Sequence, residues 1–403
     1  MDEAAHGWRR VTLREVADRI DYGYTASASA EPCGPRFLRI TDIAGAELDW
    51  ARVPFCSIDA SELSKYTLSH GDVVIARTGA SVGTTAYIGE PPEAVFASYL
   101  VRVRVTADHD SRFVYYATRT AEWRHFVDSI ASGKSAQPNA SASAMAEFTF
   151  QAPPLSEQRA IAGVLGALDD KIESNRRIIS TSMATSEAEF LQWRTSVADE
   201  DPTTFGEFAD VFGGATPSTS EPGYWGGDHV WIAPRDVTAL DSVYLFDSER
   251  HITDLGLAKS STTLHPPGSI FMTSRATIGA FAINQVPCAP NQGFIVVRPR
   301  QPEHRWFLFH EMLSRVVELQ DRATGTTFRE LSRGSFREIT LSIPSDSATF
   351  VAFDRAVDPL HARAAAASKE SASLARLRDA LLPELLSGRL RVPNAEDLVE
   401  AAV

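Results

Sequence analysis

Two long stretches of the chain place their apolar residues on one narrow helical stripe. From residue 155 to about residue 194 the chain contains no proline, and its apolar positions are separated mostly by four and three residues in alternation. This is the spacing of a heptad seam. A second stretch, about residues 347–387, repeats the pattern. The seam positions are Ile161, Leu165, Leu168, Ile172, Asn175 and Ile179 in the first stretch, and Phe353, Val357, Leu360, Ala364 and Leu374 in the second.

A narrow seam buries too little surface to hold a long helix in place alone. The pattern therefore predicts that the two helices pack on each other as an antiparallel coiled coil. Asn175 would be a buried polar residue that fixes their register. The alternative is a single surface helix on each globular domain, which explains neither the length nor the narrowness of the stripe.

Outside these two stretches, the chain contains an internal repeat of two similar halves. Residues 71–83 and 268–279 match, and they lie roughly half the chain apart. In both copies an aspartate precedes the match. An apolar strand ending in arginine, an aromatic-rich helix, a glycine-centred polar loop and a short strand with a proline follow it in the same order. A repeat of this length indicates two similar domains rather than a solenoid of small units.

The predicted fold class is therefore α+β, with two tandem pseudo-repeated domains joined by two long helices. We assign residues 1–152 to the first domain and 153–202 to a central helical spacer. Residues 203–344 form the second domain, and 345–403 form a distal helical spacer with a C-terminal tail. Different strand orders in the two halves would contradict this prediction.

Composition narrows the possible classes. The 403 residues are 44% hydrophobic, which is ordinary for globular domains. No apolar run approaches the length of about 18 residues that a membrane helix needs, and the polar N-terminus is unlike a secretory signal. Three scattered cysteines argue against a disulfide framework or a cysteine-based zinc site. We expect buried free thiols in a cytoplasmic protein.

The net charge of −13 argues against a protein coated in positive potential. It does not exclude phosphate contacts, which depend on the local distribution of charge. Arginines cluster between residues 101 and 126, and again between residues 298 and 305.

Two motifs carry a family resemblance that covers nearly the whole chain. Residues 153–161, Pro-Pro-Leu-Ser-Glu-Gln-Arg-Ala-Ile, resemble the "PPL-x-EQ-x-x-I" entry to the central helix of type I restriction–modification specificity (S) subunits. Residues 377–388 resemble that family's distal "LR-x-x-LLP-x-L-x-SG" signature. The second copy departs from the pattern, because Ile343-Pro344-Ser345 stands where a second Pro-Pro-Leu motif would be expected.

The resemblance implies that each domain is a target-recognition domain for one half of a bipartite double-stranded DNA sequence. It also implies two methyltransferase subunits as partners and, optionally, restriction subunits. S-adenosylmethionine, ATP and Mg would then be cofactors of the partner subunits, with none in this chain. Helices of 30–40 residues span roughly 45–60 Å, more than the ~34–36 Å of one DNA turn. Such a pair could space two half-sites about one turn apart.

The sequence contains none of the common catalytic motifs that its possible functions would require. Residues 79–83 look faintly like a phosphate loop but lack its spacing and its Gly-Lys-Ser/Thr ending. The chain has no Gly-x-Gly-x-x-Gly, no Asn/Asp-Pro-Pro-Tyr/Phe and no His-Glu-x-x-His motif. Asp169-Asp170-Lys171 has the residue types of a nuclease site, but we interpret it as a solvated charged face. We therefore expect no enzyme activity in this chain.

Candidate DNA-reading residues lie in predicted loops, where arginine or lysine can read guanine and asparagine or glutamine can read adenine. Residues 132–139 resemble the "SG-x-x-QPN" loop of target-recognition domains. The plainer alternatives are a polar surface loop and, for Arg77 and Arg275, salt bridges that support a turn. The candidates are Arg77, Thr78, Ser81, Lys134, Ser135, Gln137, Asn139, Arg235, Arg275, Thr277, Asn291, Gln292, Thr326 and Arg329.

Three classes of function compete. A noncatalytic DNA-specificity subunit fits the repeat and both motifs. A self-contained nuclease or methyltransferase lacks its motifs. A stand-alone two-module DNA-binding or interaction protein, without a methyltransferase partner, would suit the acidic charge. Sequence-specific DNA binding in the presence of methyltransferase subunits discriminates between the first and the last.

Overall fold

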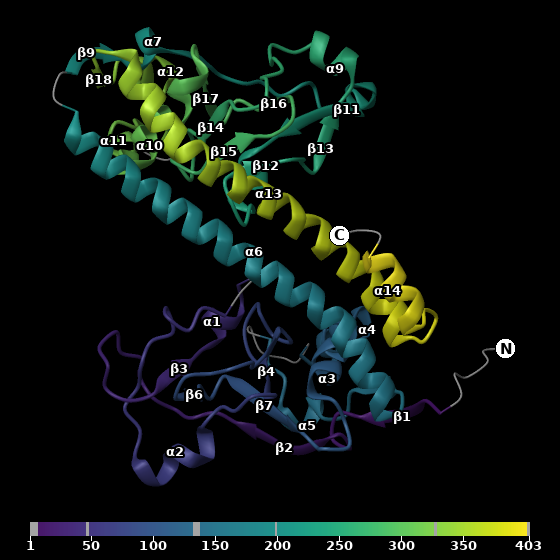
Figure 1. The fold of residues 1–403 in the computed structure, drawn as a ribbon. Helices are drawn as coiled ribbons and strands as arrows, with labels where there is room; N and C mark the ends of the chain where they lie inside the picture. The colour runs from purple at the N-terminus through teal and green to yellow at the C-terminus, as the bar shows by residue number, and fades with distance from the viewer. Residues whose placement is uncertain (1–6, 46–47, 132–137, 198–199, 326–328, 401–403) are drawn as a thin grey trace. The chain divides into compact units, whose positions relative to one another are not determined.

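The structure is a computed structural model that describes residues 7–45, 48–131, 138–197, 200–325 and 329–400. The chain folds as two compact units (Figure 1). Unit 1 comprises residues 1–173 and 373–403, and unit 2 comprises residues 174–372. The helices α6 (Leu155–Ser196) and α13 (Ser347–Leu386) each continue from one unit into the other.

Unit 1 is built around a four-stranded antiparallel sheet with the strand order β2-β7-β4-β5. An antiparallel pair, β1 and β8, and a parallel pair, β3 and β6, complete its strands. The strands are β1 (Arg9–Thr12), β2 (Ala17–Tyr22), β3 (Arg36–Leu38), β4 (Val73–Ala76), β5 (Thr85–Tyr87), β6 (Ala94–Phe96), β7 (Leu100–Val105) and β8 (Thr149–Ala152). The helices are α1 (Ile40–Ile43), α2 (Ala60–Tyr66), α3 (Ser111–Ala117), α4 (Ala121–Ala131), α5 (Ala142–Met145) and α14 (Val392–Glu400).

Unit 2 is built around a five-stranded sheet with the order β10-β17-β14-β15-β12. A three-stranded sheet, β13-β11-β16, and an antiparallel pair, β9 and β18, accompany it. The strands are β9 (Glu200–Thr204), β10 (Ala209–Phe212), β11 (Trp225–Ile232), β12 (Tyr244–Leu245), β13 (Arg250–Ile252), β14 (Ile270–Thr273), β15 (Phe281–Asn284), β16 (Cys288–Pro290), β17 (Phe294–Pro299) and β18 (Thr340–Pro344). The α-helices are α7 (Phe205–Phe208), α8 (Pro234–Thr238), α9 (Asp254–Ala258), α10 (Arg305–Ser314), α11 (Val316–Asp321) and α12 (Arg333–Arg337), and the 3₁₀ helices are Pro222–Tyr224 and Pro302–His304.

The two units share one strand order. The order β2-β7-β4-β5 of unit 1 recurs as β10-β17-β14-β15 in unit 2. The parallel pair β3–β6 recurs as β11–β16, and the antiparallel pair β1–β8 recurs as β9–β18. The predicted repeat of two α+β domains is confirmed. Unit 2 differs by the added strands β12 and β13.

Glycine is required at the same turn position in both units. Gly83 (φ +83) and Gly279 (φ +92) close the β4–β5 and β14–β15 turns in the left-handed region, which favours glycine. A Cβ at Gly83 would lie 2.8 Å from Cγ1 of Val127, and a Cβ at Gly279 would lie 2.7 Å from Cγ1 of Val316. The turn residues thus repeat because the same close approach of a helix recurs.

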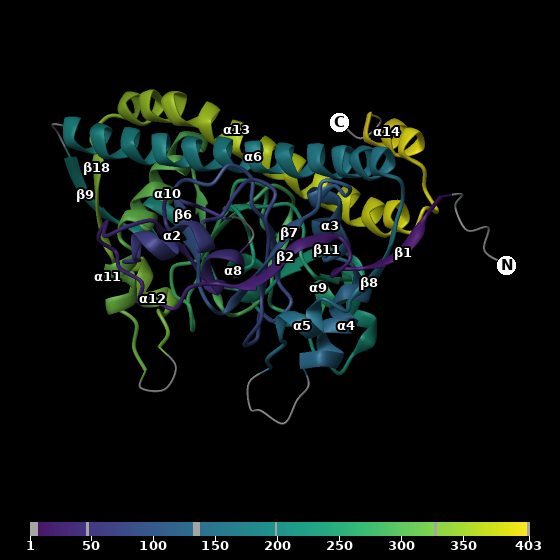
Figure 2. The same cartoon turned by 90° about the horizontal axis from the view of Figure 1, so that it is seen from below.

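The two long helices pack antiparallel, as predicted, and they run side by side in both Figure 1 and Figure 2. In unit 1 the seam residues of the first half of α6 share a core with the last part of α13, including Leu374, Leu381 and Leu385. In unit 2 the second half of α6 meets the first part of α13, where the rings of Trp193 and Phe353 lie 4.7 Å apart. Early residues of one helix therefore meet late residues of the other.

The predicted seam residues are at the contact. Those of α6 are almost completely buried, and Nδ2 of Asn175 donates a hydrogen bond to Oε2 of Glu370 at 2.7 Å across the pair. Phe353, Val357, Ala364 and Leu374 are buried in the same way, whereas Leu360 is only partly buried.

Two parts of the sequence interpretation were wrong. The cysteines were expected to be buried, but Cys33 is exposed, and only Cys56 and Cys288 are buried. Asp169 does not belong to a solvated face, because its carboxylate accepts hydrogen bonds from Tyr116 Oη at 2.6 Å and Arg378 Nη1 at 2.7 Å. Its side chain is 20% exposed, while that of Asp170 is 69% exposed and pairs with Arg112. Asp169 of α6 can be buried because α13 supplies the positively charged Arg378 as its partner.

The start of α6 explains the Glu-Gln pair of the Pro-Pro-Leu motif. Gln158 is buried, accepts a hydrogen bond from the amide of Asp110 at 3.0 Å and donates one to the carbonyl of Pro153 at 2.8 Å. Glu157 accepts hydrogen bonds from Trp8 Nε1 at 3.1 Å and Arg391 Nη1 at 2.5 Å. The motif therefore ties the first strand and the C-terminal segment of unit 1 to the helix.

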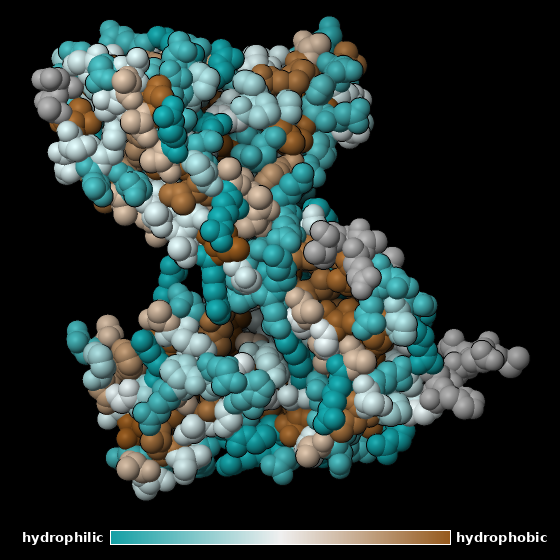
Figure 3. Space-filling model, in the orientation of Figure 1, coloured by the Kyte–Doolittle hydropathy of each residue, from teal (hydrophilic) through white to brown (hydrophobic). Residues whose placement is uncertain are grey.

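The exposed surface mixes polar and apolar residues. On the face shown in Figure 3, apolar residues gather over α14 and the adjoining end of α13. No helix in the described part of the chain is long and apolar enough to span a membrane.

Candidate nucleic-acid interface

Two segments that the sequence singled out separately lie together in unit 1. The β4–β5 turn and the end of the polar loop are joined by a β-bridge between Thr78 and Asn139. The amide of Gly79 donates to the carbonyl of Pro138 at 3.0 Å, and the amide of Ala140 donates to the carbonyl of Arg77 at 2.9 Å. A turn and a loop from distant parts of the chain thus form one surface.

Unit 2 makes the same junction. Its β14–β15 turn is joined to the polar loop by a β-bridge between Arg275 and Glu330. The amide of Leu331 donates to the carbonyl of Ser274 at 3.0 Å, which matches the bond from Ala140 to Arg77. We name these surfaces junction 1 (residues 77–83 with 138–140) and junction 2 (residues 274–279 with 329–331).

The hydrogen bonds also correct the assumed equivalence of two arginines. The amide of Arg77 donates to the carbonyl of Tyr99 at 3.0 Å, and the amide of Ser274 donates to the carbonyl of Gly293 at 2.8 Å. Arg77 therefore corresponds to Ser274, and Thr78 corresponds to Arg275. The arginines are thus offset by one residue in two turns that differ in length by one residue.

Arg77 is held by neutral groups. Its guanidinium lies over the ring of Tyr22, 4.7 Å from the centroid, and its Nη2 donates to Oδ1 of Asn139 at 3.1 Å. The Tyr22 hydroxyl is itself fixed, because it accepts a hydrogen bond from the amide of Ala142 at 2.9 Å. No carboxylate among the described residues pairs with Arg77, so its charge is available to a ligand.

Arg275 and Arg235 are different, because each has an acidic partner. Arg275 pairs with Glu330 at 2.8 Å, and Arg235 pairs with Glu249 at 2.9 Å. All four side chains are largely exposed, so these ion pairs are weak and can exchange for a phosphate. Arg329 donates to the carbonyl of Gln320 at 2.5 Å.

Of the remaining candidates, some are hydrogen-bonded within the protein and others are exposed to solvent. Oδ1 of Asn291 accepts a hydrogen bond from the amide of Gly293 at 2.7 Å, so the Asn291 side chain stabilises the turn in which it lies. Exposed Gln292 accepts a hydrogen bond from the Thr216 hydroxyl at 2.5 Å. Ser81 is partly exposed in junction 1 and Thr277 is exposed in junction 2. Lys134, Ser135, Gln137 and Thr326 lie outside the described residues.

Sequence reasoning missed two tyrosines at junction 1. Tyr22 is 41% exposed and Tyr99 is 61% exposed, which is unusual for large aromatic side chains. In the sequence, Tyr99 is part of the stretch that the repeat predicts to be an apolar strand. Its place directly before that strand, in a turn, is the signal that could have identified it.

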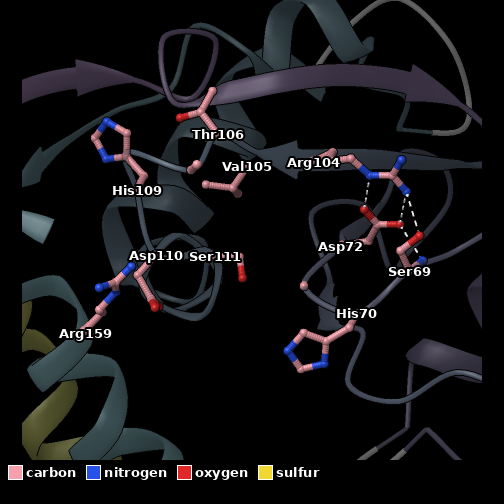
Figure 4. A pocket seen from close by; sticks show the side chains of 12 residues that line it. Ser69, His70, Asp72, Arg104, Val105, Thr106, His109, Asp110, Ser111 and Arg159 are labelled. Carbon is pink, nitrogen blue, oxygen red and sulfur yellow. Dashed lines mark hydrogen bonds and ion pairs between the residues drawn. The ribbon is translucent and has the colours of Figure 1, made fainter.

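A polar hollow of about 600 Å³ lies elsewhere in unit 1, near the start of α6 (Figure 4). On one wall the guanidinium of Arg104 donates hydrogen bonds to Asp72 and Ser69. On the other wall the ring of His109 is hydrogen-bonded to the side chain of Gln158. These groups satisfy one another, so the hollow has no concentration of unpaired charge. Among the described residues, no group of His, Cys, Asp or Glu side chains could hold a metal ion.

Taken together, the fold and the junctions define a class: a duplicated α+β protein with two equivalent loop surfaces and a shared antiparallel helix pair. The family model "Type I restriction modification DNA specificity domain" matches residues 7–181 and 200–350. The chain therefore belongs to the type I restriction–modification specificity subunit family, with two copies of its specificity domain.

Named relatives agree with this assignment. The chain is 35% identical over 149 residues to the type I restriction enzyme MjaIX specificity subunit of Methanocaldococcus jannaschii, covering 36% of this chain and 34% of that protein. It is 31% identical over 148 residues to the EcoR124I/EcoR124II specificity subunit of Escherichia coli, covering 35% of each. Each alignment thus spans only about a third of the relative's length.

A solved structure has the same fold over nearly the whole chain. The type I restriction–modification S subunit from M. genitalium superposes with a TM-score of 0.64. The match covers 96% of this chain and 98% of that one, at 15% sequence identity. At this identity the likeness bears on the fold alone.

Proposed function

We propose that this chain is the noncatalytic DNA-sequence-specificity subunit of a type I restriction–modification complex. Each unit would read one half-site of a bipartite double-stranded DNA target. The observation that carries this proposal is the recurrence of one junction, built by the same hydrogen bonds, at the same place in two units of the same strand order. Two similar reading surfaces with different side chains suit two different half-sites.

The four-part division of the chain gives each part a role in this proposal. Residues 1–152 and 203–344 would be the target-recognition domains. The helical parts, 153–202 and 345–403, would dock two methyltransferase subunits and, optionally, restriction subunits. S-adenosylmethionine, ATP and Mg would bind to those partners in the cytoplasm, and this chain would hold none of them.

The charge of the chain fits a role inside a larger complex. A net charge of −13 gives little general attraction for DNA. The partners would then supply much of the contact with phosphates, while this chain supplies base readout through a few side chains. Arg77, which has no carboxylate partner among the described residues, is the best placed of the candidates.

The test is methylation of a random DNA library by the chain assembled with its methyltransferase subunits. The expected result is one bipartite recognition sequence with a fixed nonspecific gap. Methyltransferase subunits without this chain are the control and should show no such preference. If the chain alone selects a DNA sequence and does not bind methyltransferase subunits, the stand-alone DNA-binding alternative is correct.

A further inference from the structure

Arg77 and Tyr99 are cross-strand neighbours at the end of the main sheet of unit 1. The ladder between β4 and β7 pairs Ala76 with Leu100, and the hydrogen bond from the Arg77 amide to the Tyr99 carbonyl extends it by one residue. Residues directly opposite in an antiparallel ladder share a face, with Cβ atoms ~4.5–5.5 Å apart. The backbone of Tyr99, in the turn that enters β7, therefore lies directly opposite Arg77.

The same end of the sheet carries exposed aromatic residues. Tyr22 pairs with Val101 of β7, and the Arg77 guanidinium lies over its ring. The exposed Tyr99 ring makes no ring contact and no hydrogen bond among the described residues. Two exposed tyrosines beside an arginine form a surface typical of recognition, since aromatic rings and arginine dominate binding energies.

The contacts of Arg77 leave part of its hydrogen-bonding capacity unused. Stacking on Tyr22 and the bond to Asn139 fix the plane of the guanidinium. Nη1 makes no hydrogen bond within the described residues, and no carboxylate neutralises the group. A planar fork held in place beside an open surface is suited to the O6 and N7 acceptors of guanine.

Unit 2 has no counterpart of this pair. Its equivalent positions are Ser274 and Gly293, as the matching hydrogen bond shows. Ser274 is buried and Gly293 has no side chain, so neither position offers a group to a base edge. The pair is thus a difference between the two reading surfaces, as expected of a residue that sets sequence preference.

We propose that Arg77 and Tyr99 form a base-reading pair for the half-site bound by unit 1. Arg77 donates to O6 and N7 of a guanine, and Tyr99 packs against the C5-methyl group of a thymine in an adjacent base pair. This inference rests on the proposed function, because it names which residues of junction 1 read the DNA and which bases they read.

Modified bases test the pair within the assembled complex. In the wild-type target, each guanine is replaced in turn by 7-deazaguanine, which lacks N7, and each thymine by uracil, which lacks the methyl group. We expect one guanine and one neighbouring thymine of a single half-site to be sensitive. Arg77→Ala should weaken binding of the cognate target by about 5- to 150-fold and abolish the sensitivity to 7-deazaguanine. Tyr99→Ala should abolish the sensitivity to uracil.

Conservative variants and controls separate readout from folding. Arg77→Lys keeps the charge but not the fork, so it should lose discrimination at the guanine while retaining more nonspecific affinity than Arg77→Ala. Arg14→Ala and Leu255→Ala, an exposed arginine and an exposed apolar residue elsewhere, should leave the preferred sequence unchanged. Thermal unfolding of every variant checks the fold.

The outcomes distinguish this inference from the function on which it rests. If the wild-type complex has a bipartite target but Arg77→Ala and Tyr99→Ala keep both its sequence and its affinity, the pair does not read DNA and the inference is wrong. If the wild-type complex shows no sequence preference, the proposed function fails and the inference fails with it.

Discussion

Asp169 of α6 and Arg378 of α13 form an ion pair of 2.7 Å that joins the two helices within unit 1. The same carboxylate accepts the hydroxyl of Tyr116 at 2.6 Å, so one acid connects both helices to α3. Both charged side chains are at least four-fifths buried. The neighbouring Asp170 has the opposite character, because it is mostly exposed.

We expect Asp169→Ala to reduce the free energy of unfolding by about 2–4 kcal/mol, since Tyr116 loses its acceptor and the mostly buried Arg378 keeps only the exposed Asp379 as a partner. Asp170→Ala is the matched control, and its exposed pair should contribute less than about 1 kcal/mol. Urea denaturation of both variants measures the difference. Equal effects of the two substitutions would contradict the distinction between the adjacent acids.

Two glycines of α6 should respond in opposite ways to alanine. A Cβ at Gly163 would meet no atom within 4 Å, and glycine in a helix interior costs about 0.5–1 kcal/mol relative to alanine. Gly163→Ala should therefore stabilise the protein by about that amount, as measured by its thermal midpoint. The same side chain at Gly166 would lie 2.7 Å from Cζ of Arg112.

Arg112 cannot move freely, because it donates to the carbonyl of Gly166 at 3.2 Å and pairs with Asp170 at 2.6 Å. In Gly166→Ala the clash with Arg112 should therefore outweigh the higher helix propensity of alanine. We expect this variant to be destabilised by about 1 kcal/mol. A gain equal to that of Gly163→Ala would show that Arg112 relaxes without cost.

The periodic parts of the molecule were predictable and the loops were not. Heptad spacing identified both long helices and the register residue Asn175, because burial along a seam leaves a fixed period in the sequence. The shared strand order followed from the repeat. The roles of Arg77 and Arg275 did not, because the sequence does not show that Arg77 meets Tyr22 and Asn139 whereas Arg275 meets Glu330.

Burial of charged and aromatic residues was also hard to predict. Asp169 and Asp170 are adjacent acids on one helix, yet only one meets an arginine from a helix far along the chain. The exposure of Tyr99 depends on the end of a sheet, where no neighbouring strand covers the ring. The candidate site was therefore predictable as a pair of loops but not as a set of side chains.

A buried histidine pair should make unit 2 sensitive to acid. His361 of α13 is hydrogen-bonded to Tyr244 at 2.9 Å and to His310 at 3.0 Å, and Trp306 stacks on its ring. Burial lowers the pKa of His310 to about 4, and burial with the neighbouring His310 and Arg305 lowers the pKa of His361 still further. Both imidazoles are therefore neutral in the folded state at neutral pH.

The unfolded chain takes up these protons near pH 6.5, before the folded one does, so stability is lost as the pH falls from about 6.5 toward 4. Between pH 7 and pH 5 the loss should be about 2 kcal/mol for His310 alone. Hydrogen exchange of α10 and α13 measures it. His310→Gln should flatten the pH dependence, and an unchanged slope would mean that other groups cause it.

The polar loop of unit 1 gives a prediction that separates two kinds of DNA contact. Gln137 and Lys134 lie outside the described residues, but their loop ends at Asn139 in junction 1. Gln137 offers a donor and an acceptor in one plane, as adenine requires, whereas Lys134 can only donate. Gln137→Ala should cost about 1–3 kcal/mol on the cognate site and blur one position of one half-site.

Lys134→Ala should instead weaken cognate and noncognate DNA alike, and it should reduce the slope of affinity against salt by about one unit if it contacts one phosphate. Methylation or binding across a library of target variants at fixed salt distinguishes the two results. If Gln137→Ala changes neither the preferred sequence nor the affinity, the loop is structural, and readout by junction 1 depends on Arg77 and its neighbours.

The continuity of α6 gives the last prediction, which concerns the gap between the half-sites. A helical insertion of seven residues in each long helix at the boundary between the units, after Glu173 in α6 and after Ala372 in α13, keeps both seams in register and adds about 10 Å of helix. DNA rises ~3.4 Å per base pair, so the preferred gap should lengthen by about three base pairs if the helices determine it. The two half-site sequences should remain unchanged, because neither junction is altered. A glycine- and serine-rich insertion of the same length is the control, since it breaks the helix and should give no new fixed gap. Methylation of targets with graded gaps provides the measurement, and an unchanged preference after the helical insertion would show that the helices do not measure the gap.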